Sequence, residues 1–274
     1  MADSNPSDSR RNVFAGIFGN VLEWYDFAVY GFLAPILGTA FFPADDQVAS
    51  LLAAFGVFAI GYIARPLGGV IFGHLGDKIG RKPSLILSIM CMGAATLAIG
   101  VLPAHAQIGT AAAFLLVVLR ILQGISVGGE YTGSIVFLGE HAPPEKRGLQ
   151  SCWPEFGGII GFLLGSGIGA LTSNLLGEQA MHAWGWRIPF LLGAVIAVFG
   201  AIFRRGLTET PALQNLEQRS TSPVIVALQD HWRPILRMVS LILVGSVGFY
   251  MMFVYVASYL TDQMHFSTAR AHRH

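Results

Sequence analysis

Seven long apolar stretches dominate the chain, at residues 13–37, 50–72, 84–103, 110–138, 153–176, 188–203 and 238–260. A helix needs about 20 predominantly apolar residues to cross the hydrocarbon core of a bilayer. Only 12% of the 274 residues are charged, whereas soluble chains average about 25%. The stretches are continuous, unlike the alternating segments of about ten residues in membrane β-barrels. We therefore predict an all-α membrane protein with about seven transmembrane helices.

Positive charges between the apolar stretches predict the orientation in the membrane. If the N-terminus is inside, the outer connections carry three Lys or Arg residues, Arg187, Arg270 and Arg273. The cytoplasmic segments carry twelve: Arg10, Arg11, Lys78, Arg81, Lys82, Lys146, Arg147, Arg204, Arg205, Arg219, Arg233 and Arg237. Cytoplasmic loops are enriched in Lys and Arg, so we expect a multi-pass protein whose N-terminus is cytoplasmic.

The order of polar and apolar segments predicts five regions. A cytoplasmic N-terminus (1–12) precedes a six-helix transmembrane bundle (13–203). A central cytoplasmic linker (204–237) then leads to a seventh transmembrane helix (238–262). The tail (263–274) has no apolar periodicity, and we expect it to be an aberrant or disordered end without a role.

Six charged residues fall within or at the ends of the apolar stretches: Glu23, Asp26, Arg65, Arg120, Glu130 and Glu155. A charge at the centre of a transmembrane helix costs about 2.5–3.5 kcal/mol, so such residues are expected to have partners and a function. At about 100° per residue, Glu23, Asp26 and Tyr30 share one narrow face of the first helix. Lipid cannot solvate that face, which is therefore expected to line the bundle interior or a water-filled cavity.

The fourth apolar stretch carries a second polar face, with Arg120, Gln123 and Glu130. Glu130 lies roughly 15 Å along the helix from Arg120, so these two cannot pair. Arg120 needs a partner elsewhere, and Glu23 and Asp26 are the candidates. A carboxylate whose exposure changes can bind and release a proton, and Arg binds carboxylates through a planar fork. A buried ion pair that only fixes helix register is the alternative. The predicted substrate- and proton-binding residues are Glu23, Asp26, Tyr30, Arg65, Arg120, Gln123 and Glu130.

Several classes of function lack support in the sequence. The net charge of +1 gives no basic excess for binding nucleic acid. The two cysteines, Cys91 and Cys152, lack the spacing of zinc ligands. No P-loop, HExxH or GxSxG motif is present. We therefore predict neither an enzyme nor a protein with a metal or cofactor.

Two motifs resemble those of a known superfamily. Residues 73–82, GHLGDKIGRK, resemble the signature loop G-x-L-x-D-x-x-G-R-[KR] of the major facilitator superfamily. Residues 120–124, RILQG, resemble its R-x-x-Q-G motif, which is associated with proton coupling. Further strings narrow the resemblance to the metabolite:H⁺ symporter family of organic acid and osmoprotectant permeases. They include EWYDF at 23–27, RPLGG at 65–69, GGEY at 128–131 and WGWRIPF at 184–190.

The resemblance implies a fold and a gate. Members of this superfamily alternate access between two six-helix halves of inverted three-helix repeats, with substrate near the midplane. By motif position, Asp77 and Arg81 would belong to the inner gate, and Gly73, Gly80 and Lys82 are further gating candidates. The positive residues of this loop also suit a cytoplasmic anchor, and glycines such as Gly76 and Gly80 permit a tight turn.

The resemblance also implies an activity. We expect proton-coupled symport of a small polar metabolite across the inner membrane, an organic acid such as a di- or tricarboxylate or a shikimate-like anion. The proton gradient would be the energy source, without a cofactor. Import of zwitterionic osmolytes such as proline or betaine is the alternative. The expected partners are the metabolite, protons and the lipid bilayer, with no nucleic acid.

The length suggests another alternative. The chain supplies about seven of the roughly twelve helices that the resemblance implies, as expected of a C-terminally truncated chain. It would then be a non-functional product, or a half-transporter subunit whose missing half is supplied in trans; no other obligate protein partner is expected.

Overall fold

A computed structural model describes residues 6–206 and 229–251. The chain divides into two units, residues 1–219 and 220–274, which are described separately. The described part of the first unit contains six long helices: α1 (Pro6–Phe41), α2 (Gln47–Ile79), α3 (Arg81–Val101), α5 (Thr110–His141), α7 (Trp153–Ala180) and α8 (Arg187–Arg205). Short helical segments connect them: α4 (His105–Ile108), η1 (Pro144–Lys146), α6 (Arg147–Ser151) and η2 (Met181–Gly185).

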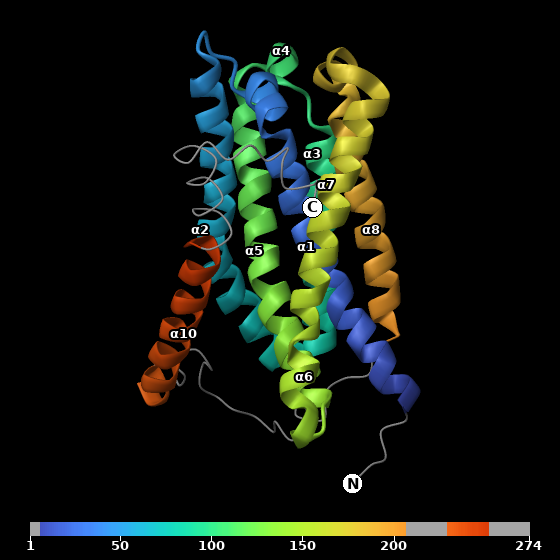
Figure 1. The fold of residues 1–274 in the computed structure, drawn as a ribbon, viewed down its shortest axis with the longest axis vertical. Coiled ribbons are helices and arrows are strands. Elements are labelled where there is room, and N and C mark those ends of the chain that lie inside the picture. Colours follow the sequence, from blue (N-terminus) through green and yellow to red (C-terminus); the bar gives the residue numbers. More distant parts are fainter. Residues whose placement is uncertain (1–5, 207–228, 252–274) are drawn as a thin grey trace, which may run out of the picture. The chain divides into compact units, whose positions relative to one another are not determined.

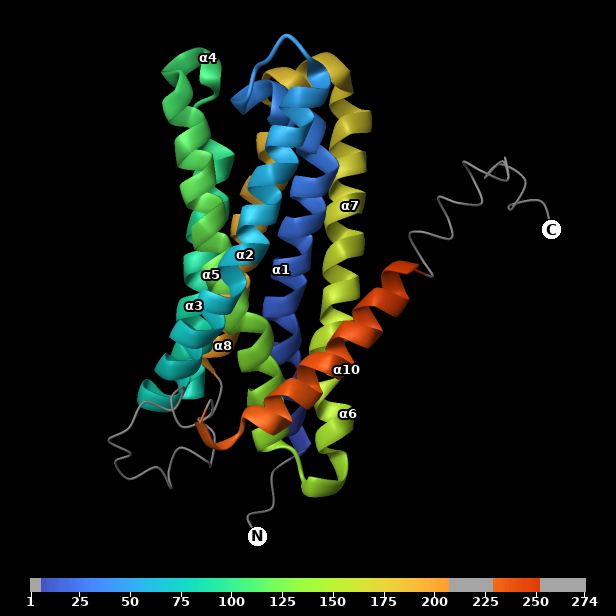
Figure 2. The ribbon, with the colours of Figure 1, turned by 90° about the vertical axis from the view of Figure 1, so that its left-hand side faces the viewer.

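The six long helices of the first unit lie side by side in one bundle (Figures 1 and 2). The α2–α3 turn and α6 lie at the end of the bundle where α1 begins, and α4 and η2 lie at the opposite end. Lys78, Arg81, Lys146 and Arg147 consequently share one end of the bundle. This grouping follows the charge pattern of the sequence, and the cytoplasmic location of that end stays a prediction.

Helices form over the first six apolar stretches, as predicted. Five segments of the described residues are long and apolar enough to cross a membrane: Gln47–Ile79, Arg81–Val101, Thr110–His141, Pro144–Gly185 and Arg187–Arg205. The helix α1 is not among them, because Glu23 and Asp26 lower the mean hydropathy of its middle. The largest differences in bounds are at α1, which begins at Pro6 instead of residue 13, and at α2, which continues to Ile79 instead of 72.

The long helices pack in three pairs. The helix α1 packs most extensively against α7, α2 against α5, and α3 against α8. In a two-repeat arrangement, α1, α2 and α3 of the first repeat correspond to α5, α7 and α8 of the second. Under this correspondence, the α1–α7 pair is equivalent to the α5–α2 pair, and the α3–α8 pair is equivalent to itself. This pattern is the one expected of two three-helix repeats.

Glycines bring α7 close to α1. Four glycines at four-residue spacing on α7 are buried: Gly157, Gly161, Gly165 and Gly169. A Cβ atom at Gly161 would overlap the carbonyl oxygen of Val21, and one at Gly157 would lie 2.7 Å from that of Ile17. Small residues allow this approach of helix backbones in membranes. The four glycines thus form a helix-packing face.

Glycines bring α5 equally close to α2. A Cβ atom at Gly124 would overlap the carbonyl oxygen of Gly61, and one at Gly128 would overlap that of Arg65. The α2 backbone at Arg65 therefore lies directly against α5. Both helices also pack against α1, so the side chains of these three helices meet in the bundle interior.

The second unit is described only at residues 229–251. It contains α10 (Trp232–Tyr250), which begins six residues before the predicted seventh span. Apolar residues Trp232, Ile235 and Leu236 continue the helical pattern toward the N-terminus of that span. The remainder of the predicted span, most of the predicted linker and the tail lie outside the described residues.

Candidate functional site

A closed ring of hydrogen bonds surrounds Asp26 in the middle of the bundle. Nη1 of Arg120 donates to Oδ2 of Asp26 at 3.0 Å and to Oε1 of Gln123 at 2.7 Å. The hydroxyl of Thr96 donates to Oδ1 of Asp26 at 3.1 Å and accepts a 2.9 Å hydrogen bond from Nε2 of Gln123. All four side chains are buried. The partner of Arg120 is therefore Asp26 rather than Glu23, and the ring joins α1, α3 and α5.

Aromatic rings line the remaining sides of Arg120. Its Cζ lies 3.9 Å from the centre of the Tyr30 ring and 5.4 Å from that of Phe58. The hydroxyl of Tyr30 donates to the carbonyl oxygen of Ala54 at 3.0 Å, which fixes this ring between α1 and α2. Cation–π contacts stabilise a desolvated guanidinium. Tyr30 thus positions the Arg120 side chain and has no direct hydrogen bond to Asp26.

Glu23 and Arg65 form a second ion pair, between α1 and α2. Nη2 of Arg65 lies 3.4 Å from Oε1 of Glu23, and neither Glu23 oxygen accepts a hydrogen bond. Nε and Nη2 of Arg65 are also buried without a hydrogen-bond partner. The Arg65 guanidinium contacts two neighbouring rings, with Cζ 4.2 Å from the centres of both Phe27 and Tyr62. The two side chains are close enough for electrostatic attraction, but Glu23 accepts no hydrogen bonds such as those that Asp26 accepts in its ring.

A third ion pair joins Glu130 on α5 to Arg204 on α8. Both carboxylate oxygens of Glu130 accept hydrogen bonds from the Arg204 guanidinium, and Ser88 and Ser134 also donate to them. Arg204 further donates to the carbonyl oxygen of Leu85 at 2.8 Å. This partner was not predicted from the sequence, in which Arg204 counts among the cytoplasmic positive charges. The structure buries Arg204 completely.

This third pair excludes even small side chains from the facing position of α1. A Cβ atom at Gly19 would overlap both the Glu130 carboxylate and the Arg204 guanidinium. Glu130 therefore lies in a tightly packed group with several hydrogen bonds, apart from the Asp26 ring. The structure does not join the seven predicted binding residues into one cluster; it distributes them over three ion pairs.

Glu155 lies at the start of α7, where it is exposed to solvent. The hydroxyl of Tyr131 on α5 donates to its Oε2 at 3.0 Å. Tyr131 is 38% exposed, so it differs from the buried residues of the polar face predicted for this helix. The pair marks the end of the bundle where α6 lies.

The predicted gating loop contains a small ion-pair network. Nη2 of Arg81 lies 2.7 Å from Oδ1 of Asp77 and 3.5 Å from Oε1 of Glu140 at the end of α5. Gly80 has φ of 109°, a value that L side chains rarely adopt, and it forms the turn between α2 and α3. Gly76 instead belongs to α2, where a Cβ atom would lie 2.8 Å from Arg81. Sequence analysis did not identify Glu140 as a partner.

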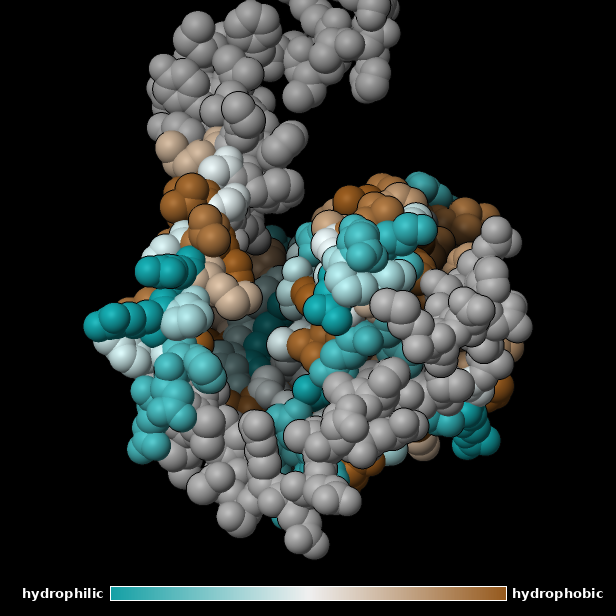
Figure 3. Space-filling model, turned by 90° about the horizontal axis from the view of Figure 1, so that it is seen from below, coloured by the Kyte–Doolittle hydropathy of each residue, from teal (hydrophilic) through white to brown (hydrophobic). Residues whose placement is uncertain are grey.

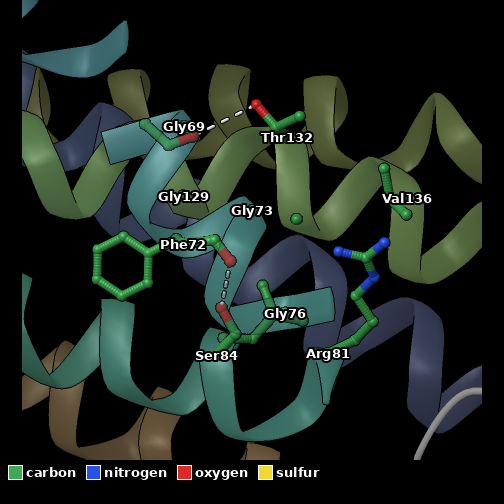
Figure 4. A pocket seen from close by; sticks show the side chains of 12 residues that line it. Gly69, Phe72, Gly73, Gly76, Arg81, Ser84, Gly129, Thr132 and Val136 are labelled. Carbon is green, nitrogen blue, oxygen red and sulfur yellow. Dashed lines mark hydrogen bonds between the residues drawn. The ribbon is translucent and has the colours of Figure 1, made fainter. Parts of the chain in front are cut away.

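A small pocket lies behind this loop, between α2, α3 and α5 (Figure 4). Gly73 and Arg81 both line it, and Lys82 is the half-buried next residue of α3. The hydroxyl of Ser84 donates to the carbonyl oxygen of Phe72 at 2.9 Å across its floor. The gating candidates of the sequence analysis thus share one end of the bundle, with Arg81 at their centre. Viewed from this end, hydrophilic side chains gather on the molecular surface (Figure 3).

No group of three or more His, Cys, Asp or Glu side chains within residues 6–206 and 229–251 could hold a metal ion. The charged side chains of the bundle interior bind one another instead. They include three carboxylates, each facing an arginine from a different helix. Such an arrangement suits charge and proton exchange with a small polar molecule.

Comparison with known proteins agrees with this architecture. The profile of a family described as "Sugar (and other) transporter" matches residues 12–223. The glycine betaine/proline/ectoine/pipecolic acid transporter OusA of Dickeya dadantii is 42% identical over 270 residues, which cover 94% of this chain and 54% of that protein. The shikimate transporter of Escherichia coli is 38% identical over 265 residues, covering 94% of this chain and 60% of that protein. The chain thus spans about half the length of the curated relatives it matches.

Solved structures show the same fold. The xylose transporter XylE from E. coli, in a partially occluded inward-open conformation, superimposes with a TM-score of 0.69 at 21% identity. The match covers 76% of this chain and 50% of XylE. These named relatives are transporters, not enzymes, and the fold is that of the major facilitator superfamily.

Proposed function

Because the chain belongs to the sugar (and other) transporter family of the major facilitator superfamily, we propose that it carries out proton-coupled import of zwitterionic osmolytes. Glycine betaine and proline are the model substrates. The protein would alternate access to the two sides of the inner membrane, with its N-terminus in the cytoplasm and the proton gradient as its energy source. If a separate chain supplies a second half, the two would act together.

The observation that carries the proton coupling is the buried Asp26–Arg120 pair. Asp26 is the only carboxylate in its hydrogen-bonded ring, and Arg120 and Thr96 both donate to it. Protonation of Asp26 would remove the negative charge that holds Arg120 and would free the guanidinium to move. Because the pair joins α1 to α5, proton binding would change the contact between these two helices. That link between protonation and helix contact is what coupling requires.

The substrate class rests on the relatives and on the charges of the site. Sequence analysis favoured an organic acid, and the comparisons favour its alternative, since the betaine and proline transporter OusA is more similar than the shikimate transporter. The interior charges point the same way. Each arginine of the bundle interior already faces a carboxylate, so a dianion would find no unopposed positive charge there.

At the end that carries the gating loop, Arg81 would act as the inner gate. It links the end of α2 through Asp77 to the end of α5 through Glu140. Breaking this network would let the helix ends separate. Gly80 would supply the turn about which they move, and Gly73 and Lys82 would flank it.

The test is uptake into proteoliposomes that contain the protein and hold an imposed pH gradient. Labelled glycine betaine and proline should accumulate when the outside is acidic, and a protonophore should abolish the accumulation. Labelled shikimate should not accumulate. Accumulation of shikimate without glycine betaine would restore the organic-acid hypothesis, and uptake that persists with the protonophore would disprove proton coupling.

A further inference from the structure

We propose that Glu23 and Arg65 form the subsite that binds the two charges of the zwitterion. Arg65 takes the substrate carboxylate, and Glu23 takes the ammonium group. This inference rests on the proposed function and deepens it, because it separates the substrate charges from the proton site at Asp26. It also predicts which features of a substrate the protein recognises.

The Glu23–Arg65 ion pair is incomplete. Three ion pairs with a buried carboxylate occur in the part of the chain that the structure describes: Arg120–Asp26, Arg204–Glu130 and Arg65–Glu23. In the first two, the carboxylate accepts hydrogen bonds from its arginine and from at least one hydroxyl. Both oxygens of Glu23 accept none, although the side chain is only 1% exposed. A buried carboxylate left in this state is costly.

Hydrogen-bond donors and acceptors of this pair lie unpaired on two neighbouring helices. Glu23 offers two acceptor oxygens on α1, and Nε and Nη2 of Arg65 offer donors on α2. A molecule with both a carboxylate and a cationic nitrogen supplies each side with a counter-charge: the ammonium group of proline also donates hydrogen bonds to Glu23, and the quaternary nitrogen of glycine betaine pairs with Glu23 by charge alone. An ordinary anion would satisfy Arg65 and leave Glu23 facing a like charge.

The charged groups of Glu23 and Arg65 lie a short distance apart. Oε1 of Glu23 lies 3.4 Å from Nη2 of Arg65. A ligand bound to both needs its own charges close together, as they are in an α-amino acid or in glycine betaine.

Arg65 is the more accessible member of the pair. The Arg65 side chain is 24% exposed, whereas Glu23 is buried behind it. The neighbouring rings of Phe27 and Tyr62, whose centres are 4.8 Å apart, both contact the guanidinium, which holds it in place beside Glu23. A substrate carboxylate would meet the exposed part of Arg65 first, and a shift of this side chain would open its buried Nε and Nη2 atoms and Glu23 to the ligand.

The experiment measures competition for glycine betaine counterflow in proteoliposomes without a pH gradient. Two competitors each lack one charge of glycine betaine: 3,3-dimethylbutyrate replaces the quaternary ammonium by a neutral tert-butyl group, and choline lacks the carboxylate. Wild-type protein should prefer glycine betaine over each by about tenfold or more, since an analogue that lacks one charge leaves a charged protein group without its partner. Equal inhibition by either analogue would overturn the proposal without any variant.

Two variants assign the charges to residues. Glu23→Gln should abolish the preference over 3,3-dimethylbutyrate and leave the preference over choline. Arg65→Gln should abolish the preference over choline and leave the preference over 3,3-dimethylbutyrate. Glu178→Gln and Arg147→Gln, which change exposed charges outside the bundle interior, serve as matched controls, and thermal unfolding checks that each variant is folded.

The outcomes separate this inference from the proposed function. If wild-type protein exchanges no zwitterion, the proposed function fails. If wild-type protein exchanges glycine betaine and both folded variants keep its preferences, the subsite is elsewhere and this inference fails. If a glutamine variant does not fold, Glu23→Asp and Arg65→Lys take its place, with a raised KM for glycine betaine as the expected result and an unchanged KM as the contrary one.

Discussion

Arg204 at the end of α8 donates hydrogen bonds to both carboxylate oxygens of Glu130, in the middle of α5. Ser88 and Ser134 donate to the same carboxylate, and the carbonyl oxygen of Leu85 accepts a further hydrogen bond from Arg204. The pair is thus satisfied on both sides and fully buried. Its arrangement suits a fixed joint between α3, α5 and α8 rather than a group that exchanges protons.

Removing one member of this pair should destabilise the bundle. Glu130→Gln leaves the Arg204 guanidinium buried without its counter-charge, and breaking a buried pair in this way costs about 3–5 kcal/mol. The melting temperature of the protein in detergent should fall accordingly. The double variant Glu130→Leu with Arg204→Leu should recover part of the loss, because no charge remains buried. A Glu130→Gln protein that melts like the wild type would contradict this role.

Gly161 on α7 should tolerate no side chain. A Cβ atom there would overlap the carbonyl oxygen of Val21, so Gly161→Ala must push α1 and α7 apart. Overpacking of this kind typically costs about 1–3 kcal/mol. Gly167→Ala on the same helix is the matched control, since nothing lies within 4 Å of its Cβ position. Thermal unfolding should show a loss for the first variant and no loss for the second; equal stabilities would mean that the close contact is unimportant.

Asp26→Asn should separate transport from proton coupling. The amide keeps the shape of the side chain and removes the group that titrates, so gradient-driven accumulation should disappear while exchange of substrate across the membrane continues. Uptake under a pH gradient and counterflow without one measure the two activities. Asp45→Asn, a change at an exposed position in the α1–α2 loop, should leave both intact. Accumulation by Asp26→Asn at the wild-type level would remove Asp26 from the proton path.

Cys152 provides a test of the predicted orientation. It is exposed at the end of the bundle where α6 lies, and that end is predicted to face the cytoplasm. A membrane-impermeant maleimide should label the protein in inside-out vesicles and not in right-side-out vesicles. Cys91, in the middle of α3, should stay unlabelled because lipid would cover it, and Cys152→Ser should abolish the signal. Labelling from the outside only would reverse the topology.

Much of the fold could be predicted from the sequence, because a transmembrane helix is a local property. Continuous apolar length sets where a helix forms in a bilayer, and six predicted stretches became helices. The bounds of α1 were harder, since its N-terminal turns are polar. The packing face of Gly161 was also predictable, because its four-residue spacing is visible in the sequence.

The pairing of charges was less predictable, because it depends on which helices become neighbours. Helical periodicity placed Asp26 and Arg120 on interior faces, and the choice between Asp26 and Glu23 required the structure. Thr96 was missed because one hydroxyl in an apolar stretch gives no signal of its own. Arg204 was missed for a different reason: its position at a helix end is also that of a topogenic charge. Only the packing of α3 against both α5 and α8 reveals the buried carboxylate that it meets.

The close glycine contacts divide the bundle into two tightly packed helix pairs. Backbone against backbone, α2 and α5 form one stiff body, and α1 and α7 form another. Asp26–Arg120 and Glu23–Arg65 each join a residue of one body to a residue of the other. Any sliding or tilting between the two bodies must stretch both ion pairs together. A proton at one ion pair and a ligand at the other would therefore both act on the contact between these two bodies. Binding of either would then change the affinity for the other.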